Sequence, residues 1–179
     1  MGLVTIPVAV KLICAVTFSQ QADPDSVLSD LVKKYGAIDV QSELFSFTQT
    51  EYYKKEMGDN LRKLYLSFKN LIMPERIVHI KLETNLLEKK YTIAGNRSVN
   101  LDPGYLEKAK LILVTTKNFS HRIYLGSGIF GDVQLRIKGG KFQIHEWTYP
   151  DYREEKVIRF FRRIRDRYCR EADEWAKSN

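Results

Sequence analysis

The chain has 179 residues, of which 29 are Lys or Arg and 22 are Asp or Glu, and 44% of its residues are hydrophobic. These values fit one globular domain with a buried core, and they exclude an intrinsically disordered or collagen-like chain. The two cysteines are far apart with no second Cys or His at ligand spacing, so neither a disulfide framework nor a zinc knuckle is indicated. No run approaches the roughly 20 apolar residues of a membrane span, and we predict a cytoplasmic protein without a membrane partner.

The first part of the chain alternates between strand and helix patterns. Residues 8–18 form an apolar run of strand length, and Asp23-Pro24 then supplies an N-cap and a first-turn proline for a helix. Gly36 stands where a left-handed C-terminal cap belongs. Residues 38–47 and 61–71 return to strand composition, so we predict that these two strands pair.

The middle of the chain completes a predicted ferredoxin-like βαββαβ unit. Residues 75–91 favour a helix, although part of this segment also alternates as a strand would. Residues 100–104 predict a type II turn, in which Pro and Gly occupy the two central positions, and residues 111–115 predict a buried strand. This α+β unit, over residues 1–118, would place two helices on one face of an antiparallel sheet and leave the other face open. Residues 119–179 would extend it within one globular domain.

The extension begins with predicted strands at residues 121–125 and 133–146. Gly139-Gly140 indicates a two-residue hairpin turn within the second of these segments. The resulting register pairs Val133 with Glu146, so that Glu146 ends an otherwise apolar strand face. A carboxylate in such a position either reaches water or finds a buried partner, which makes Glu146 a candidate functional residue.

A long amphipathic helix is predicted at the end of the chain. Asp151 and Glu154 form a capping pair before it. Arginines gather on the side of this helix away from its apolar stripe. A solvated helix face is the ordinary interpretation, and the alternative is a ridge that docks nucleic acid or an acidic protein. The ridge consists of Arg159, Arg163, Arg167 and Arg170.

A glycine-rich segment, Gly126-Ser127-Gly128-Ile129-Phe130-Gly131, precedes Val133 and matches G-x-G-x-x-G-x-V. A dinucleotide fold requires a helix after the last glycine, whereas the following residues alternate as a strand, so the Rossmann interpretation fails. The segment resembles the phosphate-covering loop of protein kinases, but no other kinase segment follows and we exclude kinase activity. Gly126, Gly128 and Gly131 either lie over phosphates or form a plain hairpin turn.

Basic and acidic residues near this segment predict a polar site on the sheet. We expect the site to bind a phosphate-bearing ligand, either a nucleotide or an RNA end, and the sequence leaves the protein partner unknown. Carboxylates with an imidazole could act as acid and base, and the carboxylates could hold Mg²⁺, although no spacing in the sequence brings them together. The predicted phosphate-binding residues are Arg97, Lys117, Arg122 and Tyr124, and the predicted catalytic residues are Asp102, His121 and Glu146.

Short segments along nearly the whole chain resemble one family. They are Tyr52-Tyr53, Glu56-Met57-Gly58, Ile80-Lys81, Thr84-Asn85, Glu88, Asn100-Leu101-Asp102-Pro103-Gly104-Tyr105, Lys117, His121-Arg122-Ile123-Tyr124 and Thr148-Tyr149-Pro150-Asp151-Tyr152. In these segments the chain is similar to a widespread uncharacterised prokaryotic family of about this length, a domain of unknown function. Some of its members are loosely labelled GTP-binding, whereas this chain has no G-x-x-x-x-G-K-[ST] motif after its first predicted strand. The resemblance implies that the polar segments between core elements are family features.

Overall fold

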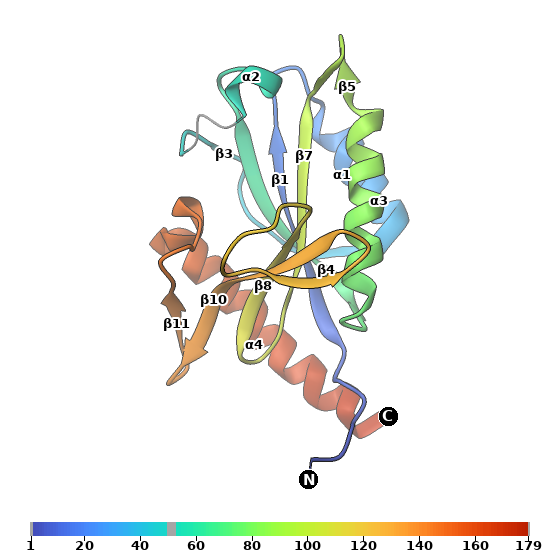
Figure 1. The fold of residues 1–179 in the computed structure, drawn as a ribbon, viewed down its shortest axis with the longest axis vertical. Coiled ribbons are helices and arrows are strands. Elements are labelled where there is room, and N and C mark those ends of the chain that lie inside the picture. The colour runs from blue at the N-terminus through green and yellow to red at the C-terminus, as the bar shows by residue number, and fades with distance from the viewer. Residues whose placement is uncertain (1, 50–52, 179) are drawn as a thin grey trace.

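An antiparallel sheet forms the centre of the computed structural model, which describes residues 2–49 and 53–178 (Figure 1). Tyr52 of the Tyr52-Tyr53 segment therefore lies outside the described residues. The strand order is β11-β10-β8-β7-β1-β4-β2, with β3 paired to β4 and β9 paired to β10. The strands are β1 (Val10–Phe18), β2 (Ile38–Gln41), β3 (Phe45–Ser46), β4 (Arg62–Ile72), β7 (Val99–Leu106), β8 (Lys110–Thr115), β9 (Ile123–Gly126), β10 (Ile129–Lys138) and β11 (Lys141–Ile144).

The remaining elements are helices and one separate hairpin, so the chain has an α+β fold. Strands β5 (Thr92–Ile93) and β6 (Asn96–Arg97) form a two-stranded sheet of their own. No helix among residues 2–49 and 53–178 is long and apolar enough to cross a membrane. The helices are α1 (Pro24–Tyr35), α2 (Lys54–Met57), α3 (Arg76–Lys90), a 3-10 turn η1 (Pro150–Arg153) and α4 (Glu155–Ser178).

The first predicted strand and helix are confirmed, and their local chemistry explains them. All nine residues of β1 are buried, which is the pattern of a central strand covered on both faces. The N-cap carboxylate of Asp23 accepts a hydrogen bond from the Asp25 backbone N–H at 3.1 Å, and Gly36 takes φ = +91° after the last turn of α1. Residues 75–91 form helix α3 almost completely, so the strand interpretation of that segment is wrong.

The predicted type II turn at residues 100–104 is wrong, because this segment lies inside strand β7. β7 runs beside β1 along its whole length, and Gly104 packs so closely on β8 that an added Cβ would stand 2.1 Å from the Ile112 carbonyl oxygen. Pairing with two neighbours therefore overrides the local preference of Pro103-Gly104 for a turn. β7, and not the strand at residues 111–115, is consequently the neighbour of β1 in the sheet.

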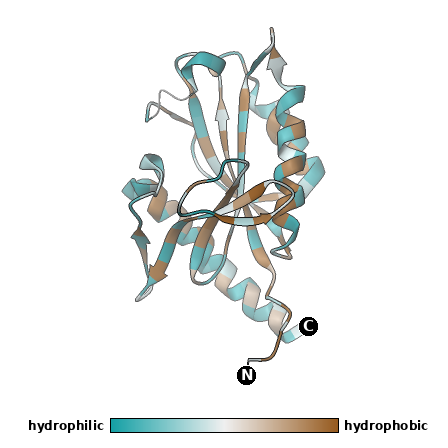
Figure 2. Ribbon diagram, in the orientation of Figure 1, coloured by the Kyte–Doolittle hydropathy of each residue, from teal (hydrophilic) through white to brown (hydrophobic). Residues whose placement is uncertain are grey.

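The two faces of the sheet bury different helices (Figures 1 and 2). Alternate residues of β1, such as Leu12 and Val16, pack with α1 and α3, whereas Ile13 and Ala15 pack with α4. Figure 2 shows hydrophobic colouring on the central strands and also on the helices that pack against them. The second face, predicted to be open, is thus partly covered by the terminal helix.

The C-terminal part joins the same sheet, because β10 pairs with β8. The predicted hairpin register is confirmed where Leu135 faces Ile144, but its extension to Val133 and Glu146 is wrong. β11 ends at Ile144 and the chain turns away, since the Thr148 hydroxyl donates to the Gln134 carbonyl oxygen at 2.6 Å. Glu146 is therefore exposed and continues no strand face.

Candidate ligand-binding pocket

Three neighbouring strands supply the floor of a polar pocket. β1 lies between β4 and β7, and the register places Thr17 between Lys63 and Asn100. These side chains project from the face that α4 also covers, beyond the start of that helix. Small residues on the central strand leave room above them. The adjacent row on the same face consists of Tyr65, Ala15 and Asp102.

A separation between β7 and β8 opens the side of this pocket. The pairing of the two strands begins at Leu106 and ends where Gly104 faces Leu113, next to Pro103, which has no N–H to continue the ladder. Lys81 on α3 reaches this opening from the other side of the sheet. Its Nζ donates to the Leu101 carbonyl oxygen at 2.9 Å and lies 3.8 Å from Asp102 Oδ1. The buried lysine therefore presents its ammonium group beside the Asp102 carboxylate.

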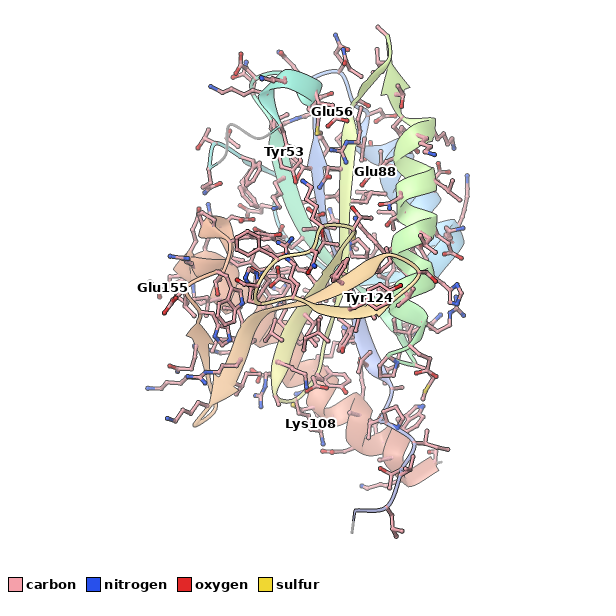
Figure 3. The ribbon with its side chains drawn as sticks, in the orientation of Figure 1. Tyr53, Glu56, Glu88, Lys108, Tyr124 and Glu155 are labelled. Atoms are coloured by element: carbon pink, nitrogen blue, oxygen red, sulfur yellow. The ribbon has the colours of Figure 1, made fainter. Side chains whose placement is uncertain are left out.

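The pocket has a volume of about 480 Å³, which lies within the ordinary range for small-ligand sites. It is lined by β4, α3, β6, β7, η1 and the segment that follows β8. Figure 3 shows Tyr53, next to α2, and Glu88, on α3, on either side of the upper half of the sheet. The lining includes the aromatic side chains Phe47, Tyr53 and Tyr149 and the amides Gln49, Asn85 and Asn100.

Asp151 occupies a buried position at one end of the pocket. Its Oδ2 accepts hydrogen bonds from Lys63 Nζ at 2.6 Å and from the Tyr65 hydroxyl at 2.5 Å. Burial and the neighbouring Asp151 carboxylate raise the pKa of Tyr65, so this phenol stays protonated and donates. Lys63 Nζ also lies 4.4 Å from the centre of the Phe47 ring. The predicted role of Asp151 as the cap of α4 is wrong, because α4 begins only at Glu155.

Arg97 forms another part of the wall and is fixed by carboxylates. One terminal nitrogen donates to Glu88 at 2.9 Å and to Asn100 at 2.8 Å, and the other donates to Glu56 at 2.9 Å. Burial lowers the pKa of Arg97, but the bonds and charges of Glu88 and Glu56 outweigh it and raise the pKa above its usual value. Glu88 also accepts the Leu101 backbone N–H at 2.6 Å. The guanidinium is thus permanently charged and held in one orientation.

Arg122 is held in a similar way on the opposite side of the pocket. Its Nε donates to the buried Asp132 at 2.8 Å, and a terminal nitrogen donates to the Tyr149 hydroxyl at 2.9 Å. Burial raises the pKa of Tyr149 to about 12, so the phenol is protonated at neutral pH. His121 contacts the same carboxylate, with Nε2 3.3 Å from Asp132 Oδ2. Asp132 therefore orients both the arginine and the imidazole from behind the wall.

The charges of the pocket are arranged in two layers. Among the described residues, five cations and two carboxylates line the wall, which gives this part of the lining a net charge of +3. Three further described carboxylates contact the two arginines from behind, so that these ten charges sum to zero. An anion in the pocket would therefore be bound by directed donors on the wall and not by a net charge. The lining charges are Lys63, Lys81, Arg97, Lys117, Arg122, Asp102 and Asp151, and the carboxylates behind are Glu56, Glu88 and Asp132.

The structure brings together only some of the residues predicted from sequence. Arg97, Lys117, Arg122 and Asp102 all line the pocket, although they come from distant parts of the chain. His121 lies behind Arg122 and does not line the pocket, and Glu146 is exposed elsewhere. The separation between β7 and β8 and the coverage of the sheet by α4 determine which predicted residues line the pocket. Neither feature was predicted from the sequence.

The glycine-rich segment does not reach the pocket. Ser127 and Gly128 take φ values of +50° and +75°, which form a two-residue hairpin turn of the primed type between β9 and β10. Tyr124 is exposed and packs against Phe130 within this hairpin. Accordingly Gly126, Gly128, Gly131 and Tyr124 are not part of the pocket lining.

The arginine ridge is divided between solvent and internal ion pairs. Arg163 and Arg170 are exposed, and Arg159 is exposed beside Glu155. Arg167 instead lies 3.2 Å from the buried Asp39 and 2.9 Å from Glu171. One of the four predicted partner-binding arginines thus helps to attach α4 to the sheet.

Two cationic pocket residues, Lys63 and Lys81, were not identified as candidates from sequence, and Asp151 was assigned a capping role. The signal for Lys81 is its position, because it falls on the buried stripe of α3 between Ile77 and Thr84, where an apolar residue is expected. Lys63 similarly interrupts a buried strand. The helix-capping signal of Asp151 concealed its contact with β4.

The described part of the chain contains no group of three or more His, Cys, Asp or Glu side chains placed to hold a metal ion. Asp102 and Asp151 are the two carboxylates among the described residues of the pocket lining. Each already has a neighbouring ammonium, from Lys81 and Lys63 respectively. Magnesium brought by a ligand's phosphates would therefore find carboxylate oxygens here only in competition with these lysines.

The comparisons with known proteins assign the chain to a family without an assigned activity. The family model described as a domain of unknown function (DUF4416) matches residues 8–168, which is most of the 179-residue chain. No curated protein and no solved structure gives a significant match.

Proposed function

Because the chain belongs to the DUF4416 family, a domain of unknown function, we propose a function from its pocket: it binds a phosphate-bearing ligand, either a nucleotide or an RNA end. The observation that carries the proposal is the convergence of five cationic side chains on one cavity of about 480 Å³. Arginine and lysine are the usual donors to phosphate oxygens, and a cavity of this size accommodates a nucleotide. The expected location for this binding is the cytoplasm.

The phosphate would lie at the end of the pocket formed by Lys81, Lys117 and Arg122. Arg122 is already oriented by Asp132 and Tyr149, so little conformational entropy would be lost when it binds an anion. Lys81 has one backbone acceptor at 2.9 Å and a carboxylate at 3.8 Å, which leaves ammonium hydrogens able to reach a ligand.

A base or another flat group would lie at the other end, against the rings of Phe47 and Tyr53. The centres of these rings are 6.4 Å apart, and both rings line the pocket. Aromatic side chains stack on nucleobases with little sequence preference. Asn85 and Asn100 supply amides that could bond a sugar or a base edge.

Asp102 is the residue best placed for chemistry, if the ligand is also a substrate. It accepts a hydrogen bond from Asn100 at 2.7 Å and lies beside Lys81. A carboxylate next to an ammonium can serve as a general base or hold a ligand's magnesium ion. His121 would act only through Asp132 and Arg122, as a positioning residue.

We also propose that residues 10–106 form a ferredoxin-like unit. Support comes from the order β7-β1-β4-β2, in which all neighbours are antiparallel, and from α1 and α3 on one face. In this assignment β7 takes the place of the strand predicted at residues 111–115. The remaining strands extend the edge of the unit beside β7.

A thermal-shift screen tests the proposed function. The purified chain is heated with each of the common nucleoside mono-, di- and triphosphates, with and without Mg²⁺, and with the corresponding nucleosides as controls. A ligand that binds only the folded state raises the melting temperature by mass action. We expect phosphorylated compounds to raise it and unphosphorylated nucleosides to leave it unchanged. Equal shifts from both sets, or none from either, would contradict the proposal.

The second candidate function is docking of nucleic acid or an acidic protein on α4. The observation in its favour is the exposure of Arg159, Arg163 and Arg170 on one helix. It is the weaker candidate, because Arg167 of the same ridge is committed to Asp39 within the chain. Neutralising the three exposed arginines separates the two functions, since the pocket does not include them.

A further inference from the structure

A second polar pocket adjoins the first at the end of the sheet. It has a volume of about 390 Å³ and lies between the segment after β1, helix α2 and the β5–β6 hairpin. Its described lining includes Ser19, Gln20, Lys55 and Asn96 together with the carboxylates of Glu56 and Asp59, and it has no aromatic rings like those of the first pocket. This pocket is separate from the residues to which the proposed function has been assigned, except at one side chain.

That side chain is Arg97, which lines both pockets. Its terminal nitrogens donate to Glu88 and Asn100 on one side and to Glu56 on the other. Its Nε is buried and has no hydrogen-bond partner among the described residues. Figure 3 shows Glu56 and Glu88 at the same end of the sheet as Tyr53. The guanidinium is therefore a fixed cationic partition that a ligand can contact from either pocket.

Ser19 supplies an independent sign that the second pocket accepts a polar group. Only 6% of this residue is exposed, and its backbone N–H donates to the Ser98 carbonyl oxygen at 2.8 Å. Its hydroxyl oxygen is buried and has no partner in the described part of the chain. Buried hydroxyl groups are normally hydrogen-bonded, so an acceptor or donor from a ligand would complete this one.

The chemistry of the two linings differs in the way that the two ends of a nucleotide differ. The first pocket offers rings for stacking. The second offers hydroxyl, amide and carboxylate groups, which suit a sugar, and the ammonium of Lys55 and the guanidinium of Arg97, which suit its phosphate. From these observations, and resting on the proposed function, we infer that the ligand is a phosphodiester-linked dinucleotide unit. One nucleotide occupies the first pocket, and the phosphate and sugar of its neighbour pass Arg97 into the second.

Calorimetric titration of the full chain tests this inference. The probes are the 5′-phosphorylated homodinucleotides of A, C, G and U and the four matching mononucleotides. For the preferred base, we expect the dinucleotide to bind about ten-fold more tightly than the mononucleotide, because it gains one or two charge-assisted hydrogen bonds in the second pocket. In K55A and S19A this advantage should fall to less than about three-fold, while the mononucleotide Kd stays constant. K89A, which removes an exposed lysine outside both linings, is the matched control.

The outcomes distinguish this inference from the proposed function. A dinucleotide that binds no more tightly than its mononucleotide overturns the inference and leaves the proposed function standing. Equal loss of both ligands in K55A also overturns it. Failure of every nucleotide to bind overturns both. A titration with a hexanucleotide identifies the source of the ligand. Binding at least as tight as that of the dinucleotide indicates the end of a strand, and weaker binding indicates a free dinucleotide. Both results are consistent with the inference.

Discussion

The substitution D39N tests how the terminal helix is attached to the sheet. The side chain of Asp39 on β2 is 3% exposed, and its carboxylate lies 3.0 Å from the fully buried Lys11 and 3.2 Å from Arg167 on α4. It also accepts a hydrogen bond from Ser67 at 2.5 Å. Glu171 on α4 contacts Lys11 as well. One carboxylate thus joins two strands and the helix, and asparagine keeps its shape while removing its charge.

The expected loss of stability follows from the buried charge that D39N leaves without its partner. Removing one partner of a buried ion pair costs about 3–5 kcal/mol, because the other charge remains in a low-dielectric site. Glu171 would still neutralise Lys11, so we expect a loss of about 2–4 kcal/mol in the free energy of unfolding. The measurement is urea denaturation at neutral pH. The matched control is D173N, whose side chain is 62% exposed in a surface pair and should cost less than about 1 kcal/mol.

The same substitution predicts a pH dependence. Burial raises the pKa of Asp39, but hydrogen bonds from Ser67 and Lys11 outweigh it, so that the pKa is lower in the folded chain than in the unfolded one. The stabilisation is therefore present above the unfolded pKa of about 3.9 and is lost as the pH falls through the folded pKa. The difference between the wild type and D39N should shrink below about pH 4. A loss of less than about 1 kcal/mol at neutral pH, or a difference that grows on acidification, would refute this reasoning.

Two substitutions and one labelling experiment test the fold around the pocket. G104A should destabilise the chain by about 3 kcal/mol in urea, because the new Cβ would stand 2.1 Å from the facing carbonyl oxygen of β8. Y65F should cost about 1.5–3 kcal/mol by the same assay, since it removes a hydrogen bond to the buried carboxylate of Asp151. Cys14 should resist alkylation by iodoacetamide under native conditions while the half-exposed Cys169 reacts, because burial and the charge of Asp102 raise the pKa of Cys14.

Each of these tests has its own contrary result, and G104A also has a control variant. G2A adds a methyl group where nothing lies within 4 Å, and it should leave stability unchanged; an equal loss in G2A and G104A would contradict the close approach of β7 and β8. For Y65F the contrary result is unchanged stability. Rapid native labelling of Cys14, followed by mass spectrometry of the peptides, would show that the core beside β7 opens readily.

Local sequence patterns predicted the elements whose reasons are local. The Asp23-Pro24 start of α1 and the Gly139-Gly140 turn depend on capping and backbone geometry, which adjacent residues determine. Residues 100–104 were assigned wrongly because Pro103 and Gly104 indicate a turn in isolation. Only the two flanking strands, distant in sequence, hold this segment extended.

The pocket was predictable only in part for the same reason. Arg97 and Arg122 attracted notice as isolated cations, and the structure places both on its wall. Lys81 and Asp151 looked like ordinary helix residues, since their partners lie 20 and 88 positions away in the sequence. A charged residue on an otherwise apolar helix face is the feature that could have identified Lys81.

Calorimetric titration of ATP and GTP into three forms of the chain tests the central claim most directly. The forms are the wild type, the pocket variant K81M and the ridge variant R159A/R163A/R170A. Loss of one charged hydrogen bond to phosphate should weaken binding by about 10–100-fold in K81M, and the ridge variant should bind like the wild type. Circular dichroism and urea denaturation establish that each variant is folded. Binding that persists in K81M but disappears in the ridge variant would contradict the assignment of the ligand to this pocket.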